Sequence, residues 1–233
     1  IHEYPLDGKP PMMTHIFENS SGKRIIAAKG APEALMQVSN LSSEQRSEIE
    51  KAIQTITEDG YRVLGVGLSN YSGTYFPDTQ QEFKFDFKGI VAFYDPPKEN
   101  IEAVLNQFYT AGISVKIITG DNAETTTAIA RKVAFRGVEN SLSGDQLMLL
   151  TDEELQGRVA ETNIYTRMFP EAKLRIINAL KANKQIVAMT GDGVNDGPAL
   201  KAAHIGIAMG KKGTEIAKRA ASLILVDDDL SKM

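Results

Sequence analysis

The feature that most constrains this chain is the alternation of strand-like and helix-like segments after residue 95. Apolar runs lie at 113–118, 163–166, 185–189, 205–208 and 223–226, and segments with apolar residues at helical spacing lie at 101–112, 123–134 and 171–182. Strands that alternate with helices predict an α/β fold, a parallel sheet with helices on both faces. Binding sites in such sheets lie outside the carboxyl ends of the strands.

The motif Asp95-Pro96-Pro97 precedes this section, and consecutive prolines cannot donate hydrogen bonds to a strand ladder. Residues 1–94 are typical of mixed α and β structure, and we predict two domains, 1–94 and 95–233. A helix after Ser42 is well supported, because Ser42 and Gln45 fit a capping box. Further predictions are a helix at 31–38 and strands at 12–17, 24–28, 61–68, 83–87 and 89–94.

Composition excludes several classes of function. The 233 residues carry 26 basic and 30 acidic side chains, so the net charge is 26 − 30 = −4, and no nucleic-acid partner is expected. The absence of cysteine excludes disulfides, thiolate nucleophiles and cysteine-ligated metals. No apolar run approaches ~18 residues, so we predict no membrane span, and no secretory signal is visible.

Two predicted strands end in similar polar sequences, Thr119-Gly120-Asp121 and Thr190-Gly191-Asp192-Gly193-Val194-Asn195-Asp196. Threonine hydroxyls and the amides of glycine-rich turns suit phosphate oxygens, and carboxylates suit Mg²⁺. Lys173, in the first turn of a predicted helix, adds a cation that can neutralise a phosphoryl group. The pair of turns indicates a Mg²⁺-assisted phosphate site. Taken singly, Thr-Gly-Asp also fits an ordinary turn or helix cap, and a helix lysine is usually solvated.

Taken in order, the motifs resemble those of the P-type ion-pumping ATPases, most nearly the calcium pumps and related bacterial cation pumps. The resemblance covers nearly the whole chain. It is carried by Lys29-Gly30-Ala31-Pro32-Glu33, Asp95-Pro96-Pro97-Lys98, Thr119-Gly120-Asp121, the segment from Arg167 to Lys173, the segment from Thr190 to Leu200, the run from Ile205 to Gly210, and Asp227-Asp228. It implies that 1–94 is the C-terminal half of an α+β nucleotide-binding domain. It implies that 95–233 is a phosphorylation domain of the haloacid-dehalogenase type, with a Rossmann-like parallel sheet.

For the first section, the resemblance implies an ATP site. Lys29 and Gly30 would line the pocket, Arg62 would bind the nucleotide phosphates, and Lys9 would lie near the nucleotide. Tyr4 stands where the family usually has a phenylalanine that stacks on adenine. Without the motifs, the three cations fit ordinary surface positions and Tyr4 fits a core or strand-edge aromatic residue.

For the second section, the resemblance assigns the predicted phosphate site. The Thr119-Gly120-Asp121 turn would contact phosphate and nucleotide, and Lys173 would contact the phosphoryl group. Asp192 would ligate Mg²⁺, and Asn195 and Asp196 would support the phosphate and metal. Gly197 and Lys98 depart from the usual family residues without removing a ligand.

The resemblance implies the cytosolic, ATP-hydrolysing portion of an integral membrane pump that moves a cation, most simply Ca²⁺, through an aspartyl-phosphate. The Asp-Lys-Thr-Gly-Thr stretch that carries the family's nucleophile is absent from this sequence, so this segment alone is predicted to be inactive. The rest of the same chain, with the membrane helices and the cation sites, would be its partner at the cytoplasmic face.

Two other functions stay open. One is a soluble phosphatase of the same superfamily, for which Leu223–Val226 followed by Asp227 and Asp229 would supply a nucleophile and an acid. The other is a non-catalytic nucleotide-binding module. Because the family's nucleophile strand lies centrally in the sheet, we also expect the strands ending in Thr119 and Asp192 to lack a shared neighbour, and the fragment to self-associate.

Overall fold

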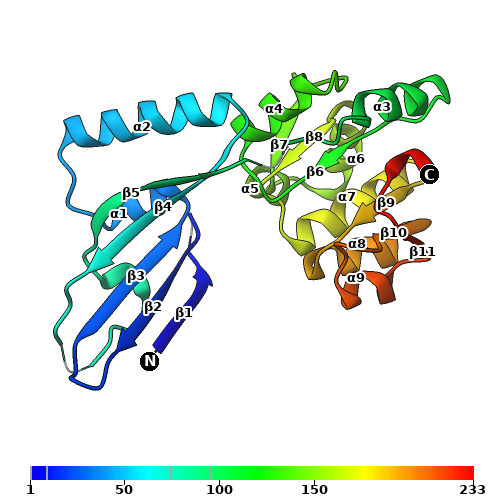
Figure 1. The fold of residues 1–233 in the computed structure, drawn as a ribbon. Helices are drawn as coiled ribbons and strands as arrows, with labels where there is room; N and C mark the ends of the chain where they lie inside the picture. Colours follow the sequence, from blue (N-terminus) through cyan, green and yellow to red (C-terminus); the bar gives the residue numbers. More distant parts are fainter. Residues whose placement is uncertain (1, 9, 74, 95) are drawn as a thin grey trace. The chain divides into compact units, whose positions relative to one another are not determined.

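The computed structural model describes residues 2–8, 10–73, 75–94 and 96–233. The chain divides into two compact units, Ile1–Asp95 and Pro96–Met233 (Figure 1). The division falls within the Asp95-Pro96-Pro97 motif, where proline stiffens the backbone and removes hydrogen-bond donors. No helix among the described residues combines the length and the apolar character that crossing a bilayer demands.

The first unit contains a five-stranded antiparallel sheet in sequential order. Its strands are β1 (His2–Asp7), β2 (Met12–Glu18), β3 (Arg24–Gly30), β4 (Arg62–Ser69) and β5 (Asp86–Phe93). Its helices are α1 (Pro32–Gln37) and α2 (Ser43–Glu58), and a short 3-10 turn spans Gln80–Glu82. The Ser42–Gln45 capping box is present at the start of α2, as predicted.

The two faces of this sheet differ in burial. Helix α1 covers one face, where Gly65 allows close approach, since a Cβ there would lie 3.0 Å from the Cα of Pro32. The core on that face comprises Tyr4, Met12, Ile16, Ile26, Ala28, Ala34, Leu35, Phe83 and Phe85. On the opposite face, hereafter the open face, large apolar side chains of β2, β3, β4 and β5 are exposed, namely Phe17, Ile25, Leu68, Val91 and Phe93.

Two predictions for this unit are wrong. Strand β1 is not predicted by the sequence analysis, because Pro5 and the charged residues obscure the alternation. The alternating phenylalanines at 83–87 were predicted as a strand separate from 89–94, but one strand, β5, begins only at Asp86. Phe83 and Phe85 precede the strand and are buried in the core. Their alternation with polar residues therefore reflects burial of the two rings, not membership of a strand.

The second unit contains two three-stranded parallel sheets, in the orders β6-β8-β7 and β9-β10-β11. Their strands are β6 (Ile117–Ile118), β7 (Ser141–Ser143), β8 (Ile164–Thr166), β9 (Ala188–Gly191), β10 (Ile205–Met209) and β11 (Leu223–Leu225). The helices are α3 (Ile101–Thr110), α4 (Ala123–Lys132), α5 (Gly144–Met148), α6 (Asp152–Glu161), α7 (Pro170–Ala182), α8 (Gly197–Ala202) and α9 (Glu215–Ala220).

Helices cover both faces of the β6-β8-β7 sheet. Ile164 packs with residues of α3 and α4, whereas its neighbour Tyr165 packs with residues of α6 and α7. The β9-β10-β11 sheet packs against α7, α8 and α9 through residues such as Met189 and Ala208, while Ile205 and Leu223 on its other face are exposed. The predicted α/β class, with parallel sheets flanked by helices and an added antiparallel sheet, is therefore confirmed.

The expectation of one continuous sheet needs correction. Strands β6 and β9 are each hydrogen-bonded on one side only, so the two sheets share no ladder. Ile118 of β6 nevertheless packs against the cores on both sides, so side chains join the two sheets. We call the break in strand pairing between β6 and β9 the strand gap. It matches the expected lack of a shared neighbour between these strands.

Candidate functional site

The turn after β6 is joined by backbone hydrogen bonds to the turn after β8. The N–H of Thr119 donates to the carbonyl of Tyr165 at 2.9 Å, which continues the strand pairing. The N–H of Arg167 then donates to the carbonyl of Asp121 at 2.8 Å, and the N–H of Met168 to that of Thr119 at 2.9 Å. Within the first turn, the Thr119 Oγ1 accepts the N–H of Asp121 at 3.1 Å. The Thr119-Gly120-Asp121 segment is thus fixed at the end of its sheet.

Asp196 organises the turn after β9. Its Oδ2 accepts the backbone N–H of Asp192 at 3.2 Å and that of Gly193 at 3.0 Å, so its carboxylate closes the turn from within. Gly191 is required beside it, since a Cβ at that position would lie 2.6 Å from the Cβ of Asp196.

Lys173, near the start of α7, binds the remaining oxygen of Asp196. Its Nζ lies 2.6 Å from the Asp196 Oδ1, and the two side chains are only 11 % and 9 % exposed. A buried ion pair of this geometry compensates two charges that would otherwise be strongly disfavoured. Because both Asp196 oxygens are engaged, Asp196 holds Lys173 and the turn in position. The exposed carboxylate for a metal in this turn belongs to Asp192.

Asp192 is exposed, and its carboxylate makes no hydrogen bond or ion pair with the described residues. Its backbone carbonyl is fixed by the N–H of Thr214 at 2.8 Å. Mg²⁺ is commonly held by one or two carboxylates together with water and substrate phosphate, so the donor set fits Mg²⁺ bound in that manner. No group of three or more acidic, histidine or cysteine side chains in the described part of the chain forms an all-protein metal site.

The hydrogen bonds above connect the predicted phosphate-site residues in a continuous series. The turn from Thr119 to Asp121 contacts Arg167 and Met168, which lead into α7 and Lys173, and Lys173 contacts Asp196 beside Asp192. The exposed side chain of Asn195 lies in the same turn. One residue was missed: Arg167 has a positive φ of 50°, a conformation uncommon outside glycine and often found at functional sites. No sequence signal indicates this strain.

In the first unit, Lys29 and Arg62 share the open face. Lys29 pairs with Val66, and Arg62 lies four residues earlier along β4, which corresponds to about 14 Å at ~3.4 Å per residue. Both side chains are exposed. Gly30 is buried beside β2, where a Cβ would lie 2.6 Å from the Cα of Met12, so this glycine permits close strand packing.

Tyr4 does not join these cations, because it lies on the opposite, buried face. Its ring is 7 % exposed and packs edge-on to Phe83, and its hydroxyl donates to the carbonyl of Pro77 at 2.5 Å. The expected grouping of Tyr4 with Lys29 and Arg62 is therefore not observed, and the alternative of a core aromatic residue describes Tyr4. Lys9, also assigned to the nucleotide, lies outside the described residues.

A β-bulge brings another side chain of β1 toward Lys29. Tyr4 pairs with Thr14 and Asp7 with Met12, so Pro5 and Leu6 both stand opposite Met13. Met13 pairs with Lys29 on the next strand, and Leu6 is 64 % exposed. Sequence reasoning missed Leu6, because the position of a bulge cannot be read from a short alternation that Pro5 interrupts.

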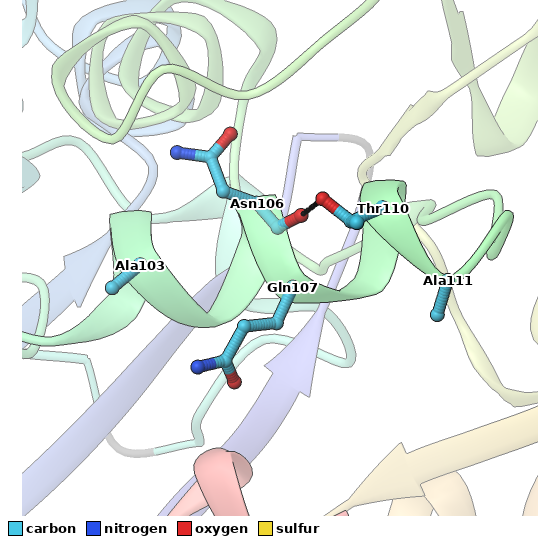
Figure 2. A pocket seen from close by; sticks show the side chains of 5 residues that line it. All are labelled: Ala103, Asn106, Gln107, Thr110 and Ala111. Atoms are coloured by element: carbon cyan, nitrogen blue, oxygen red, sulfur yellow. Dashed lines mark hydrogen bonds between the residues drawn. The ribbon is translucent and has the colours of Figure 1, made fainter.

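One hollow of about 400 Å³ lies along α3, outside these sites (Figure 2). Its lining residues all belong to α3 and its last turn, namely Ala103, Asn106, Gln107, Thr110 and Ala111. The Thr110 hydroxyl is engaged by the carbonyl of Asn106 at 2.8 Å. This shallow helix surface contains no charged group and none of the predicted site residues, so we assign it no function.

Comparison with known proteins identifies the class. Residues 27–204, more than half of the chain, match the haloacid dehalogenase-like hydrolase family, and the chain belongs to that family. Among curated proteins, it is 37 % identical to a calcium-transporting ATPase of Bacillus subtilis over 99 % of this chain and 27 % of that protein. It is 34 % identical to a sodium/potassium exporting P-type ATPase of Schizosaccharomyces pombe over 100 % of this chain and 24 % of that protein.

A third relative, a probable cation-transporting ATPase F of Mycobacterium tuberculosis, is 38 % identical over 89 % of this chain and 24 % of its own length. The chain thus spans about a quarter of the length of these relatives. The resemblance to cation-transporting P-type ATPases stated from the motifs is confirmed by these similarities over nearly the whole chain.

Proposed function

We propose that this chain is the cytosolic catalytic portion of a P-type ATPase that uses ATP and Mg²⁺ to move a cation across a membrane. The observation that carries the proposal is the Lys173–Asp196 pair beside the exposed Asp192, at the carboxyl end of a parallel strand. The names of the relatives support a cation as cargo, and the calcium-transporting ATPase of Bacillus subtilis favours Ca²⁺. In this proposal the unit of residues 96–233 is the phosphorylation domain, at the cytoplasmic face of the membrane.

The proposed phosphoryl site assigns each residue a distinct task. Thr119, Gly120 and Asp121 contact phosphate and nucleotide, and Lys173 neutralises a phosphoryl oxygen. Asp192 supplies a carboxylate to Mg²⁺, whose charge would offset that of the phosphate when bound. Asn195 supports the site from the same turn, and Asp196 fixes both Lys173 and the turn.

The proposed nucleotide site lies on the open face of the first unit, which would be part of a nucleotide-binding domain. Lys29 and Arg62 share that face, and phosphate groups suit both cations. Leu6 and Met13 beside Lys29 offer an apolar surface for the base, so they replace Tyr4 in the proposed site. Lys9 remains a proposal from the resemblance alone, and Gly30 acts through packing against β2.

The strand gap supports the proposed partner, the rest of the same protein. Strands β6 and β9 present unpaired edges on either side of it, and their ends carry the site residues. A parallel strand inserted there would pair with both and would end beside Asp121 and Asp192. We propose that another part of the protein supplies this strand together with the aspartate that is phosphorylated, and that the chain alone forms no phosphoenzyme.

The soluble-phosphatase alternative is less well supported. It would make Asp227 the nucleophile, but Asp227 follows β11, which β10 separates from β9. Asp227 is paired with Lys232, and Asp229 accepts a hydrogen bond from Asn100 at 3.2 Å. These contacts occupy the two carboxylates at a position remote in strand order from Asp192.

Titration of the chain with Mg·ATP, followed through backbone amide signals, tests the proposal. We expect a dissociation constant in the millimolar range, about −4 kcal/mol, with changes near Lys29 and Arg62 and in the Asp192 turn. Lys29→Ala and Arg62→Ala should each weaken binding, whereas Lys23→Ala, which lies just before the other end of β3, should not. Micromolar binding that neither change affects would contradict the assignment of these two cations.

A further inference from the structure

The turn after β11 is anchored by a buried carboxylate that the proposed function does not use. Asp228 is 6 % exposed and has a positive φ of 59°. Its Oδ1 accepts the backbone N–H of Lys211 at 3.0 Å, and its Oδ2 accepts that of Lys212 at 3.0 Å. Asp228 therefore holds the loop that follows β10.

That loop leads directly to the proposed metal ligand. Two residues beyond Lys212, the N–H of Thr214 donates to the backbone carbonyl of Asp192 at 2.8 Å. The loop backbone packs closely on the end of β10 at Gly213, where a Cβ would lie 2.0 Å from the carbonyl oxygen of Met209. Fixing the amides of Lys211 and Lys212 consequently fixes Thr214, and Thr214 fixes the backbone that carries the Asp192 carboxylate.

The same turn also forms hydrogen bonds with residues at the start of the second unit. The Nζ of Lys98 donates to the backbone carbonyl of Asp228. Asn100 donates to the Asp229 Oδ1 at 3.2 Å, so the adjacent residue makes a parallel contact. The contacts of Asp228 thus reach both the segment before α3 and the loop beside Asp192.

The chemistry of Asp228 suits this task. Burial disfavours its charged form, but the N–H groups of Lys211 and Lys212 outweigh that effect and hold the pKa of the carboxyl below its usual value. The side chain is therefore ionised at neutral pH, and hydrogen bonds to a charged acceptor are stronger than those between neutral groups.

We propose that Asp228 is a positioning residue for Asp192, acting through the loop of residues 210–214. The inference rests on the proposed role of Asp192 as a Mg²⁺ ligand. Metal ligands depend on the groups that orient them, and loss of such a partner commonly weakens metal affinity by roughly 10–100-fold. Asp228 acts one step further away, so its loss weakens Mg²⁺ binding less than loss of a direct partner of the ligand.

The test uses the full chain and Mg²⁺ alone as the probe. Mg²⁺ is titrated against the wild type, Asp228→Ala, Asp228→Asn, the matched control Asp229→Asn and Asp192→Asn, with the amide signals of Asp192 and Gly193 as readout. Hydrogen exchange of the Thr214 amide is measured in the same samples. Exchange of the Ser222 amide, which donates to the Gly206 carbonyl at 2.8 Å, reports on the adjacent sheet.

We expect Asp228→Ala to raise the Mg²⁺ dissociation constant by about 3–10-fold, below the range for direct partners, and to accelerate exchange at Thr214 while Ser222 stays protected. Asp228→Asn should be intermediate, because its one amide oxygen can serve only part of the loop. It also remains informative should the alanine variant unfold. Asp229→Asn should behave as wild type, since its contacts do not reach the loop.

Two outcomes separate this inference from the proposed function. Wild-type Mg²⁺ affinity or wild-type Thr214 exchange in both Asp228 variants, with binding lost in Asp192→Asn, would overturn the role of Asp228 alone. Unchanged Mg²⁺ binding in Asp192→Asn would instead refute the proposed metal ligand, and exchange at Thr214 would still decide whether Asp228 fixes the loop. Equal acceleration at Thr214 and Ser222 would show general destabilisation and would count against a positioning role.

Discussion

Replacement of Asp196 by alanine is the perturbation that most directly tests how the site is held together. The change removes the only carboxylate that contacts the Lys173 Nζ, at 2.6 Å, among the described residues. It also removes the acceptor for the N–H groups of Asp192 and Gly193. Lys173 would then lack this acidic partner in a site where its side chain is 11 % exposed.

The expected loss of stability follows from that burial. Removing one partner of a buried ion pair typically costs about 3–5 kcal/mol, because the other charge is left uncompensated. Lys173→Met should cost less, about 2 kcal/mol, since Asp196 would keep its two backbone donors. The double variant should be more stable than the sum of the two single losses predicts, with a coupling energy of about 2 kcal/mol.

Urea unfolding, followed through amide signals resolved for each unit, measures these quantities. The chain has two units, so a single transition cannot be assumed, and the first unit serves as an internal reference. We expect the midpoint to fall for Ile177 in the second unit and to stay unchanged for Ile26 in the first. A loss below about 1 kcal/mol for Asp196→Ala, or a coupling energy near zero, would refute the argument that this pair is buried and mutually dependent.

Two further predictions follow from burial and from the strand gap. Burial raises the pKa of the Tyr165 phenol well above its ordinary value of 10.0. The unfolded chain therefore loses this proton first, and the free energy of unfolding should fall as pH rises above about 10. If Tyr165→Phe leaves the slope of unfolding free energy against pH unaltered above about pH 10, this prediction is contradicted. The unpaired edges of β6 and β9 should cause self-association, measured by sedimentation velocity over a range of concentrations. A chain that stays monomeric at the highest concentration would show that these edges do not pair with strands of another copy.

Local sequence signals predicted much of the fold. The capping box at Ser42 and Gln45 located α2, and apolar spacing located α3, α4 and α7 within a few residues. These signals succeed because caps and helical stripes involve neighbours in sequence. Strand β7 and helices α5, α6, α8 and α9 were not predicted. Strand β7 has only three residues, and α5, α8 and α9 have five or six, too few for a clear apolar pattern. Helix α6 was missed although Thr151 and Glu154 form a capping box at its start.

Long-range pairing explains the remaining errors. The β1 bulge decides which side chains of that strand face Lys29, and it depends on the register against β2, which a single strand does not encode. Tyr4 was therefore grouped with the wrong face. The turn residues around Asp192 were recognisable as a dense set of polar groups. Which of these carboxylates is exposed, that of Asp192, and which is buried, that of Asp196, became clear only from the contact between Asp196 and Lys173 in the structure.

The separation of the two parallel sheets has a mechanical consequence. No backbone ladder joins β6 to β9 among the described residues, so relative sliding of the two sheets would repack side chains, such as Ile118 and those of α7, without breaking a strand ladder. Small sliding movements of packed elements are the shear type of motion, and they cost far less than breaking a ladder. Lys173 follows a strand of one sheet and Asp196 follows a strand of the other, so their ion pair joins the two sheets. Any sliding of one sheet past the other would therefore change the distance between the Lys173 Nζ and the Asp196 carboxylate.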